Sequence, residues 1–205
     1  GFGGRTINND KPKYLNSPET NIFHKGSTIY GIHEATIGKK INNLIITEGY
    51  LDVISLSQAG LTGVVATLGT AITKNQLNLL FRETEHLIFC FDGDKAGKNA
   101  GIKACKISLE MLSDNRQIDF CFLEEEDDPD QLVKKVGAKE FFNRTKKQQI
   151  HDLLINSVKD ELNQGASDAQ NVRLVEKAKP FIKQILGQNQ KRMAIKKLAS
   201  ATSFD

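Results

Sequence analysis

Short apolar runs recur along the middle of the chain. Residues 44–47, 64–68, 87–91 and 118–123 are rich in aliphatic, β-branched and aromatic side chains, which favours strands. The run at 87–91 (Leu-Ile-Phe-Cys-Phe) is apolar throughout, so both of its faces are expected to be buried. The pattern therefore predicts four strands in this region.

Amphipathic segments fill the intervals between these strands. Helices are expected over about residues 51–59, after Thr73, and over about 96–112. At the start of the second helix, Gln76 is placed to complete a capping box with Thr73. Alternation of strand and helix predicts an α/β fold, a mostly parallel sheet with right-handed crossovers and helices on both faces. In such folds, ligand-binding and catalytic groups gather at the carboxyl ends of the strands.

The regions on either side have a different pattern. Residues 1–30 are rich in Gly, Asn, Lys, Ser and Thr, which indicates loops and short strands. After Asp130 we expect only helices, with no strand among them, and Pro180 should kink or interrupt the third. These helices are predicted near residues 131–145, 150–163, 169–186 and 189–200. The chain is accordingly divided into residues 1–41, 42–130 and 131–205, the last being a small all-helical subdomain.

The composition fits a globular protein with a core of its own. The chain has 205 residues, of which 39% are hydrophobic and 26% charged. No stretch approaches the roughly 18 uninterrupted apolar residues that a membrane helix needs, and residues 1–5 lack the apolar segment of a secretory signal. The three cysteines form no C-x-x-C pair, which argues against a structural zinc site in this chain and for a reducing, cytoplasmic setting.

Charge is distributed unevenly along the chain. The net charge is +3 over residues 1–41, −8 over 42–130 and +8 over 131–205. An acidic centre between basic ends fits a carboxylate metal site with basic surfaces for a polyanion, although solvated faces of ordinary helices would give similar totals. The choice between these readings depends on where the carboxylates lie.

The first two acidic motifs directly follow predicted strands. Glu48 directly follows the strand at 44–47, and Asp52 falls in the first turn of the next helix. Asp92 and Asp94 follow the third strand with a glycine between them, so both can turn toward one divalent cation. Mg²⁺ is bound by oxygen ligands, often one or two carboxylates together with substrate phosphates.

A third acidic motif, Asp127-Asp128-Pro129-Asp130, follows the fourth strand. Each motif also has a purely structural explanation, since Asp52 complements a helix N-terminus while Asp94 and Asp128 are suitable N-caps. Taken together, the three motifs bring six carboxylates to one sheet edge, an arrangement suited to one or two metal ions in phosphoryl transfer. The repulsion within the acidic run before Pro129 should be offset by a cation nearby.

The Glu-Gly and Asp-x-Asp strand ends, 44 residues apart, resemble the Toprim fold shared by primases, type IA and II topoisomerases and certain nucleases. Further strings are similar to the bacterial DnaG-type DNA primase family. They are residues 13–20 (KYLNSPET), 23–26 (FHKG), 48–52 (EGYLD), 68–70 (LGT), 92–97 (DGDKAG) and 127–130 (DDPD). The resemblance covers residues 1–145, and the helical tail only by position and character.

The resemblance implies a bacterial, cytoplasmic DNA-directed RNA polymerase that makes short RNA primers on single-stranded DNA for replication. It implies nucleotidyl transfer from ribonucleoside triphosphates with Mg²⁺ or Mn²⁺, and zinc only in a module absent from this chain. Glu48, Asp92 and Asp94 would be the catalytic metal ligands. Asp52, Asp128 and Asp130 would complete the acidic cluster as further metal ligands. A basic ridge that binds nucleic acid or nucleotide would consist of Arg5, Lys13, Asn16 and Lys25.

Compared with the full family protein, the zinc-binding module, the first part of the polymerase core and the helicase-binding domain have no counterpart here. We therefore expect an excised fragment that need not be active alone, with the replicative helicase contacted through an absent domain. Two alternatives stay open. A Toprim topoisomerase or nuclease would need a catalytic tyrosine or nuclease residues in companion domains, and no candidate tyrosine stands out among Tyr14, Tyr30 and Tyr50. A non-catalytic single-strand DNA-binding module would leave the acidic cluster unexplained.

Overall fold

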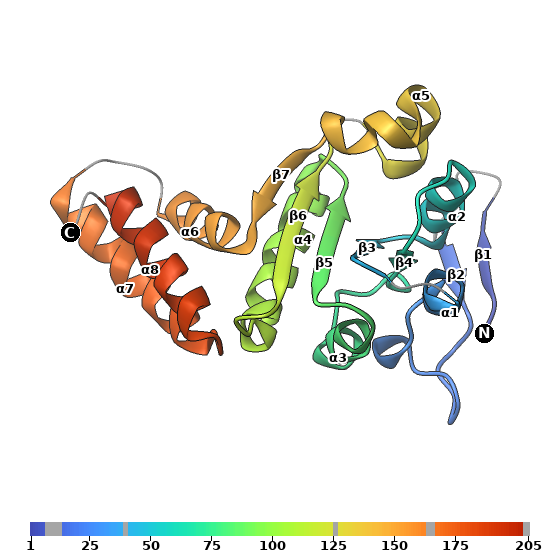
Figure 1. Ribbon diagram of the computed structural model, residues 1–205, viewed down its shortest axis with the longest axis horizontal. Helices are drawn as coiled ribbons and strands as arrows, with labels where there is room; N and C mark the ends of the chain where they lie inside the picture. The colour runs from blue at the N-terminus through green and yellow to red at the C-terminus, as the bar shows by residue number, and fades with distance from the viewer. Residues whose placement is uncertain (7–13, 39–40, 125–126, 163–166, 203–205) are drawn as a thin grey trace.

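A five-stranded sheet forms the centre of the protein in the computed structural model, which describes residues 1–6, 14–38, 41–124, 127–162 and 167–202 (Figure 1). The strand order is β4-β3-β5-β6-β7. The strands are β3 (Leu44–Thr47), β4 (Val64–Ala66), β5 (His86–Phe91), β6 (Gln117–Phe122) and β7 (Lys146–Gln149). The first four pair in parallel, and β7 pairs antiparallel with β6. The predicted mostly parallel sheet is confirmed.

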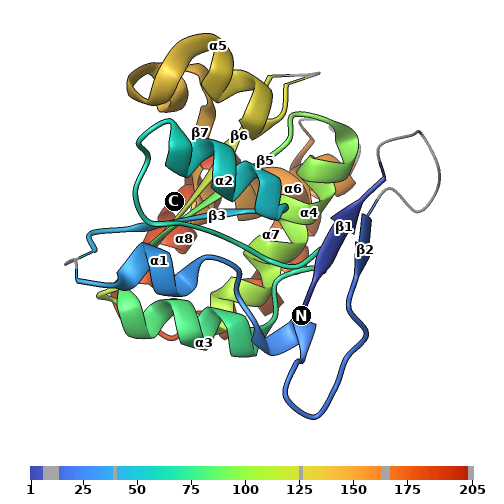
Figure 2. The ribbon, with the colours of Figure 1, turned by 90° about the vertical axis from the view of Figure 1, so that its right-hand side faces the viewer.

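Helices cover both faces of this sheet, as predicted. They are α2 (Tyr50–Gln58), α3 (Lys74–Glu83), α4 (Lys95–Ser108, continued by the 3-10 turn Leu109–Met111), α5 (Pro129–Phe141) and α6 (Ile150–Glu161). In Figure 2, α2 and α5 lie above the strands and α3 lies below them. Alternate residues of β3 point to opposite faces of the sheet. Leu44 and Ile46 belong to a hydrophobic cluster with residues of α3, α4 and α6. Ile45 belongs to a second, smaller cluster with residues of α2 and α5.

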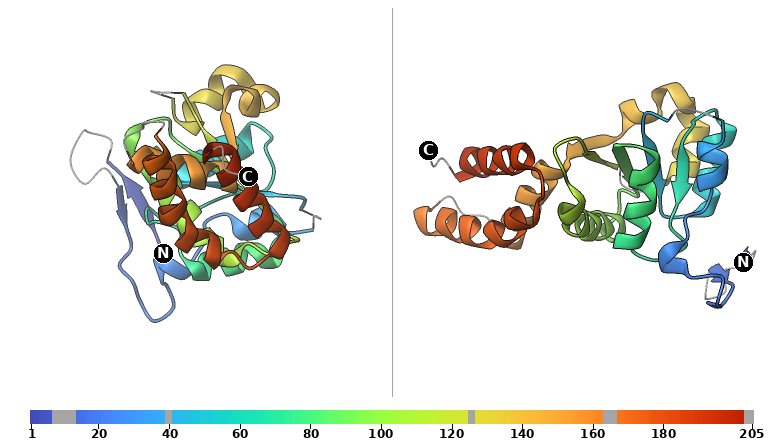
Figure 3. Two further views of the ribbon diagram at one scale, coloured as in Figure 1. Left: turned by 90° about the vertical axis from the view of Figure 1, so that its left-hand side faces the viewer. Right: turned by 60° about the horizontal axis from the view of Figure 1, so that its bottom comes forward.

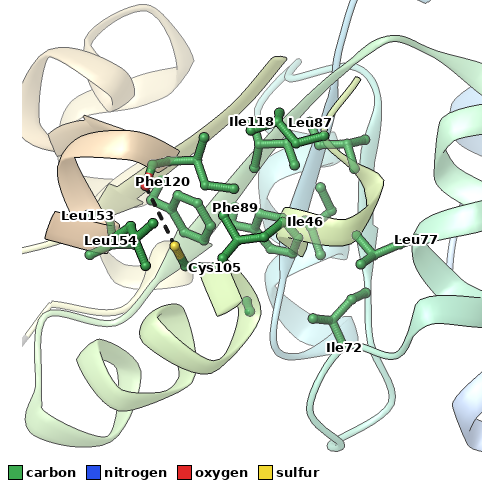
Figure 4. Packing of buried hydrophobic residues seen from close by; sticks show 14 of the residues in the cluster. Ile46, Ile72, Leu77, Leu87, Phe89, Cys105, Ile118, Phe120, Leu153 and Leu154 are labelled. Carbon is green, nitrogen blue, oxygen red and sulfur yellow. Dashed lines mark hydrogen bonds between the residues drawn. The ribbon is translucent and has the colours of Figure 1, made fainter. Parts of the chain in front are cut away.

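The larger cluster joins the sheet to the helices that follow it. Figure 4 shows Ile46, Phe89 and Phe120, from three adjacent strands, packed together with side chains of the flanking helices. The thiol of Cys105 in α4 donates to the carbonyl oxygen of Ile150 at the start of α6, at 3.6 Å. This continuous packing holds α4 and α6 against each other on one face of the sheet.

Smaller elements lie at the two ends of the molecule (Figures 1 and 3). Near the N-terminus are β1 (Gly3–Arg5), β2 (Tyr14–Asn16), a 3-10 turn (Lys25–Ser27) and α1 (Ile32–Thr36). Strands β1 and β2 form a separate antiparallel pair. Near the C-terminus, α7 (Asp168–Gln184) and α8 (Gln188–Thr202) pack on each other and on α6. Within the described ranges, no helix has the length and apolar character needed to cross a membrane.

The predicted capping box at the start of α3 is confirmed by the structure, and a glycine follows the end of α2. The Thr73 hydroxyl accepts from the Gln76 backbone N–H at 3.1 Å, and the Gln76 side chain accepts from the Thr73 N–H at 3.0 Å, which completes the capping box. Gly60, with φ of 100°, follows α2 in a conformation that glycine adopts without strain.

The expectation that no strand follows Asp130 is wrong, because β7 extends the sheet. Its sequence, Lys-Lys-Gln-Gln, has no apolar residue, so hydrophobic patterning gave no signal for it. Strand β7 lies at the sheet edge and is mostly exposed, and its pairing with β6 uses backbone groups that any polar residue supplies.

Helix α7 is not interrupted at Pro180, one of the two outcomes expected there, and continues through this residue. Because proline has no N–H, Pro180 cannot donate a hydrogen bond to the carbonyl group of Glu176, and both residues are exposed. The interruption is in α5 instead, at Gly137, where φ is 75° and ψ is 168°. The helix predicted near 131–145 is therefore two shorter helical pieces, followed by a 3-10 turn (Phe142–Arg144).

Candidate metal centre

The three acidic motifs meet at one edge of the sheet. Glu48 follows β3, Asp92 follows β5, and Asp127 and Asp128 lie between β6 and α5. Strands β3, β5 and β6 are adjacent and parallel, so their carboxyl ends point the same way. The juxtaposition expected from the strand order is thus present.

The carboxylates at this edge influence one another electrostatically. Desolvation at the sheet edge, followed by the charges of Asp92 and Asp94, raises the pKa of Glu48 to about 7. Burial and the charge of Asp92 likewise raise the pKa of Asp52 to about 7, with smaller contributions from Asp128 and Asp130. All six predicted carboxylates therefore belong to one electrostatic cluster, although Glu48 itself is exposed and Asp52 is half-buried.

Several of these carboxylates also have the structural roles that the sequence suggested. The Asp94 side chain accepts from the Gly97 backbone N–H at 2.7 Å and begins α4. Asp128 accepts from the Gln131 N–H at 2.7 Å, with Pro129 as the first residue of α5. Asp52 accepts from the Gly49 N–H at 3.2 Å. These bonds fix the carboxylates in place, so helix capping and a metal-binding role are compatible.

Two lysines offset part of the negative charge. Lys134 Nζ lies 2.8 Å from Asp130, which also accepts from the Ser55 hydroxyl, and Lys135 pairs with Asp127. The cation expected near the acidic run is therefore supplied by the first helical turns of α5. Glu48 and Asp94 lie outside both of these ion pairs, at the ends of other strands.

The donor set fits a hard divalent cation better than a soft one. The cluster consists of carboxylate oxygens, and the nearby Cys90 is buried with a thiol pKa raised well above its ordinary value, first by desolvation. Within the described ranges, no group of three or more Asp, Glu, His or Cys side chains is arranged to hold a metal ion. Carboxylate oxygens are the type of ligand that hard divalent cations prefer, and such ions take further ligands from water and phosphate.

Glycines bring the acidic loops together, a feature the sequence analysis did not predict. A Cβ atom on Gly97 would lie 2.3 Å from the Asp92 carbonyl oxygen, and one on Gly101 would lie 2.6 Å from the Phe122 ring. The spacing of Gly93, Gly97 and Gly101, four residues apart, was the available signal. It permits α4 to approach β5 and β6 more closely than side chains would allow.

A cavity of about 480 Å³ opens beside the acidic edge. Glu48 and Thr70 lie at its rim, and Asn99 and Lys103 of α4 contribute polar groups over a floor that includes Phe89. Gly69 and Thr70, which belong to the LGT string at residues 68–70, also line this cavity.

The predicted basic ridge is only partly within the described residues. Asn16 donates to the Leu68 carbonyl oxygen at 3.4 Å, so it lies next to the loop that borders the cavity. Lys25 is half-buried and begins the first 3-10 turn, and Arg5 is the last residue of β1. Lys13 lies outside the described residues. The nucleic-acid role of these four residues stays a prediction.

The fold and the acidic edge define a Toprim-like protein. Residues 45–133 match the Toprim-like family, and residues 1–36 match the N-terminal domain of the DNA primase catalytic core. The chain is 43% identical to the DNA primase of Escherichia coli K12 over 190 residues, which are 92% of this chain and 32% of that protein. It therefore spans about a third of that relative's length.

Solved structures agree with these matches. A DNA primase domain from Pseudomonas aeruginosa superposes with a TM-score of 0.91 and 37% identity, over 99% of this chain and 64% of that one. The DnaG primase catalytic domain bound to single-stranded DNA gives a TM-score of 0.89 and 39% identity, over 98% of this chain and 65% of that one. The chain belongs to the bacterial DnaG-type DNA primase family.

Proposed function

We propose that this chain is the metal-binding part of a DNA primase catalytic core, which makes short RNA primers on single-stranded DNA by nucleotidyl transfer from ribonucleoside triphosphates. The observation that carries the proposal is the electrostatic coupling of Glu48, Asp52 and Asp92 at the carboxyl edge of a Toprim sheet. The relatives of this chain are DNA primases, which favours this function over that of a topoisomerase or nuclease.

Glu48, Asp92 and Asp94 would hold one or two Mg²⁺ or Mn²⁺ ions, and Asp52, Asp128 and Asp130 would complete the acidic surround. A bound divalent ion supplies positive charge that lowers the pKa of a primer 3′-hydroxyl and neutralises phosphate oxygens. The N-cap bonds of Asp94 and Asp128 keep those two side chains oriented, so little reorganisation is needed when a substrate arrives.

The nucleotide and the template would occupy the two sides of Glu48. The cavity lined by Asn99 and Lys103 suits an incoming ribonucleoside triphosphate, because it combines a cation, an amide and an apolar floor. Arg5, Lys13, Asn16 and Lys25 would hold template phosphates, contacts that position a strand without reading its sequence. The RNA primer, the bacterial cytoplasm and a replicative helicase acting on the complete protein are further parts of this proposal.

The test is calorimetric titration of the chain with Mn²⁺, with and without ribonucleoside triphosphate. Asp92→Asn should weaken Mn²⁺ binding by about tenfold or more, since it removes a charged oxygen ligand. Glu83→Gln, which removes one exposed carboxylate at the end of α3, is the matched control and should bind as the unaltered chain does. Equal Mn²⁺ affinities for Asp92→Asn and the unaltered chain would show that the assignment of Asp92 is wrong.

A further inference from the structure

Two adjoining open cavities lie behind the acidic edge, between α4, β7 and α6. Their volumes are about 530 and 500 Å³, and they share Lys98, Phe122 and Lys146 as lining residues. The first begins at Gly93 and Glu124, in the loops that carry the acidic motifs. The second continues along α6 as far as Lys159 and Asp160. We call this continuous depression the β7 groove.

The register of β7 explains why its two lysines face different surroundings. Lys146 is paired with Phe122, and Lys147 is paired with Cys121. Paired residues point to the same face of a sheet, so Lys146 lies on the side of Phe122, which is the side of α4 and α6. Lys147 lies on the opposite side, where its Nζ is 3.0 Å from the buried carboxylate of Asp119. The charge of Lys147 is therefore used within the protein, whereas Lys146 faces the groove.

Two cations of the β7 groove near the acidic edge, Arg144 and Lys146, are available to an external anion. Arg144 and Lys146 are exposed, and within the part of the chain that the structure describes neither forms an ion pair. Asn143 and Thr145 alternate with them along the same segment and add hydrogen-bonding groups. Farther along, Gln148 has a buried side-chain oxygen with no hydrogen-bond partner among the described residues.

We propose that the β7 groove binds the sugar–phosphate backbone of single-stranded DNA that continues past the acidic edge, an inference that rests on the proposed function. Gly93, which lies between Asp92 and Asp94, lines the groove, so a strand at the metal site has a direct path into it. Arg144 and Lys146 then meet its phosphates, while the apolar floor at Phe122 offers no donor or acceptor pattern that would distinguish bases.

The test measures binding of a fluorescein-labelled oligodeoxythymidylate by anisotropy over a series of salt concentrations. Arg144→Gln/Lys146→Gln removes two cations while leaving β7 pairing possible, and it should weaken binding several-fold at low salt. Loss of two phosphate contacts should reduce the slope of log affinity against log salt by about 1.4. Arg173→Gln/Lys177→Gln on the exposed side of α7 is the charge-matched control and should leave affinity and slope unchanged.

A second variant separates charge from local structure. The exchange Arg144→Lys/Lys146→Arg keeps both charges and should retain most of the affinity, whereas loss of affinity in this variant would indicate a folding effect and overturn the proposal. Unchanged DNA binding by the Gln variant, or no binding by the unaltered chain at low salt, would also overturn it. Tripolyphosphate binding is measured in parallel, and loss of that binding alone would assign the groove to free phosphate compounds instead. Because Mn²⁺ binding and its loss in Asp92→Asn are measured separately, failure here leaves the proposed function standing.

Discussion

A Cβ atom built on Gly93 would lie only 2.2 Å from the backbone carbonyl oxygen of Glu124. At Gly93, therefore, the loop after β5 touches the loop after β6, and the two acidic motifs are held at one separation by backbone contact. A side chain at this position would push the loops apart, because the atom it would meet belongs to the main chain rather than to a flexible side chain.

Gly93→Ala should lower the free energy of unfolding by about 1–3 kcal/mol, the usual effect of overpacking a close contact. It should also weaken Mn²⁺ binding, since Asp92 and Asp94 move with the loop. Urea unfolding and calorimetry measure the two effects. Gly4→Ala in β1, where the nearest atom to the new Cβ would be 4.0 Å away, is the control. If both alanine variants are equally stable, the contact does not hold the loops.

The raised pKa values of Glu48 and Asp52 make stability depend on pH. Their ordinary pKa values are 4.5 and 3.8, and both rise to about 7 in the folded protein. Between these limits the folded state binds more protons than the unfolded state, so the free energy of unfolding should fall as pH rises from about 4 to about 7. Asp92→Asn removes a charge that raises both pKa values, so the free energy of unfolding of this variant should fall less steeply over the same pH range.

The measurement is urea unfolding from pH 4 to 8 without divalent ions. Glu83→Gln serves as the control for loss of one distant carboxylate, and its curve should run parallel to that of the unaltered chain. Added Mn²⁺ should restore stability at pH 7 and above, because the ion binds the deprotonated carboxylates. Parallel curves for Asp92→Asn and the unaltered chain would refute the proposed coupling.

The parallel strands could be predicted because burial on both faces leaves continuous apolar runs in the sequence. The carboxylates Glu48, Asp92 and Asp128 could also be found, since each directly follows such a run and parallel strands bring their ends to one edge. Their metal-binding and catalytic roles stay predictions until metal binding is measured.

Strand β7 could not be predicted in the same way. Lys146 and Lys147 carry no apolar periodicity, and their opposite surroundings depend on β6, which lies more than twenty residues earlier. The contacts of Asp119 likewise come from three places in the chain, namely His86, Gln117 and Lys147. Such tertiary groupings leave no local signal, so only the assembled sheet reveals the β7 groove and the buried carboxylate behind it.

The basic ridge predicted from the sequence can be tested by Lys13→Ala/Lys25→Ala. If both lysines contact DNA phosphates, the slope of log affinity against log salt for single-stranded DNA should become smaller by about one to two released counterions. Lys25 anchors its turn through backbone groups, with its N–H 3.2 Å from Glu19 and its carbonyl 2.9 Å from Gln76, so alanine should preserve the local structure. An unchanged slope, as expected for the α7 control, would remove the two lysines from the interface.

Asp119 ties β7 to the sheet through a buried carboxylate. Its side chain is 1% exposed, and one oxygen lies 2.8 Å from His86 Nε2, 2.8 Å from Gln117 Nε2 and 3.0 Å from Lys147 Nζ. Burial alone would raise the pKa of Asp119, but the hydrogen bonds from His86, Lys147 and Gln117 outweigh burial and lower it. The charged form is therefore the stabilising one.

Asp119→Asn should lower the free energy of unfolding at pH 7 by about 1.5–3 kcal/mol, the range for a hydrogen bond to a charged group. Because the folded pKa is lowered, this contribution is present above the ordinary value of 3.8 and is lost as pH falls below it. The stability gap between the variant and the unaltered chain, measured by urea unfolding, should therefore narrow in acid. Lys147→Met removes only a half-exposed partner and should have a smaller effect. A gap that is absent at pH 7, or that does not change with pH, would mean that Asp119 does not stabilise β7 through its charge.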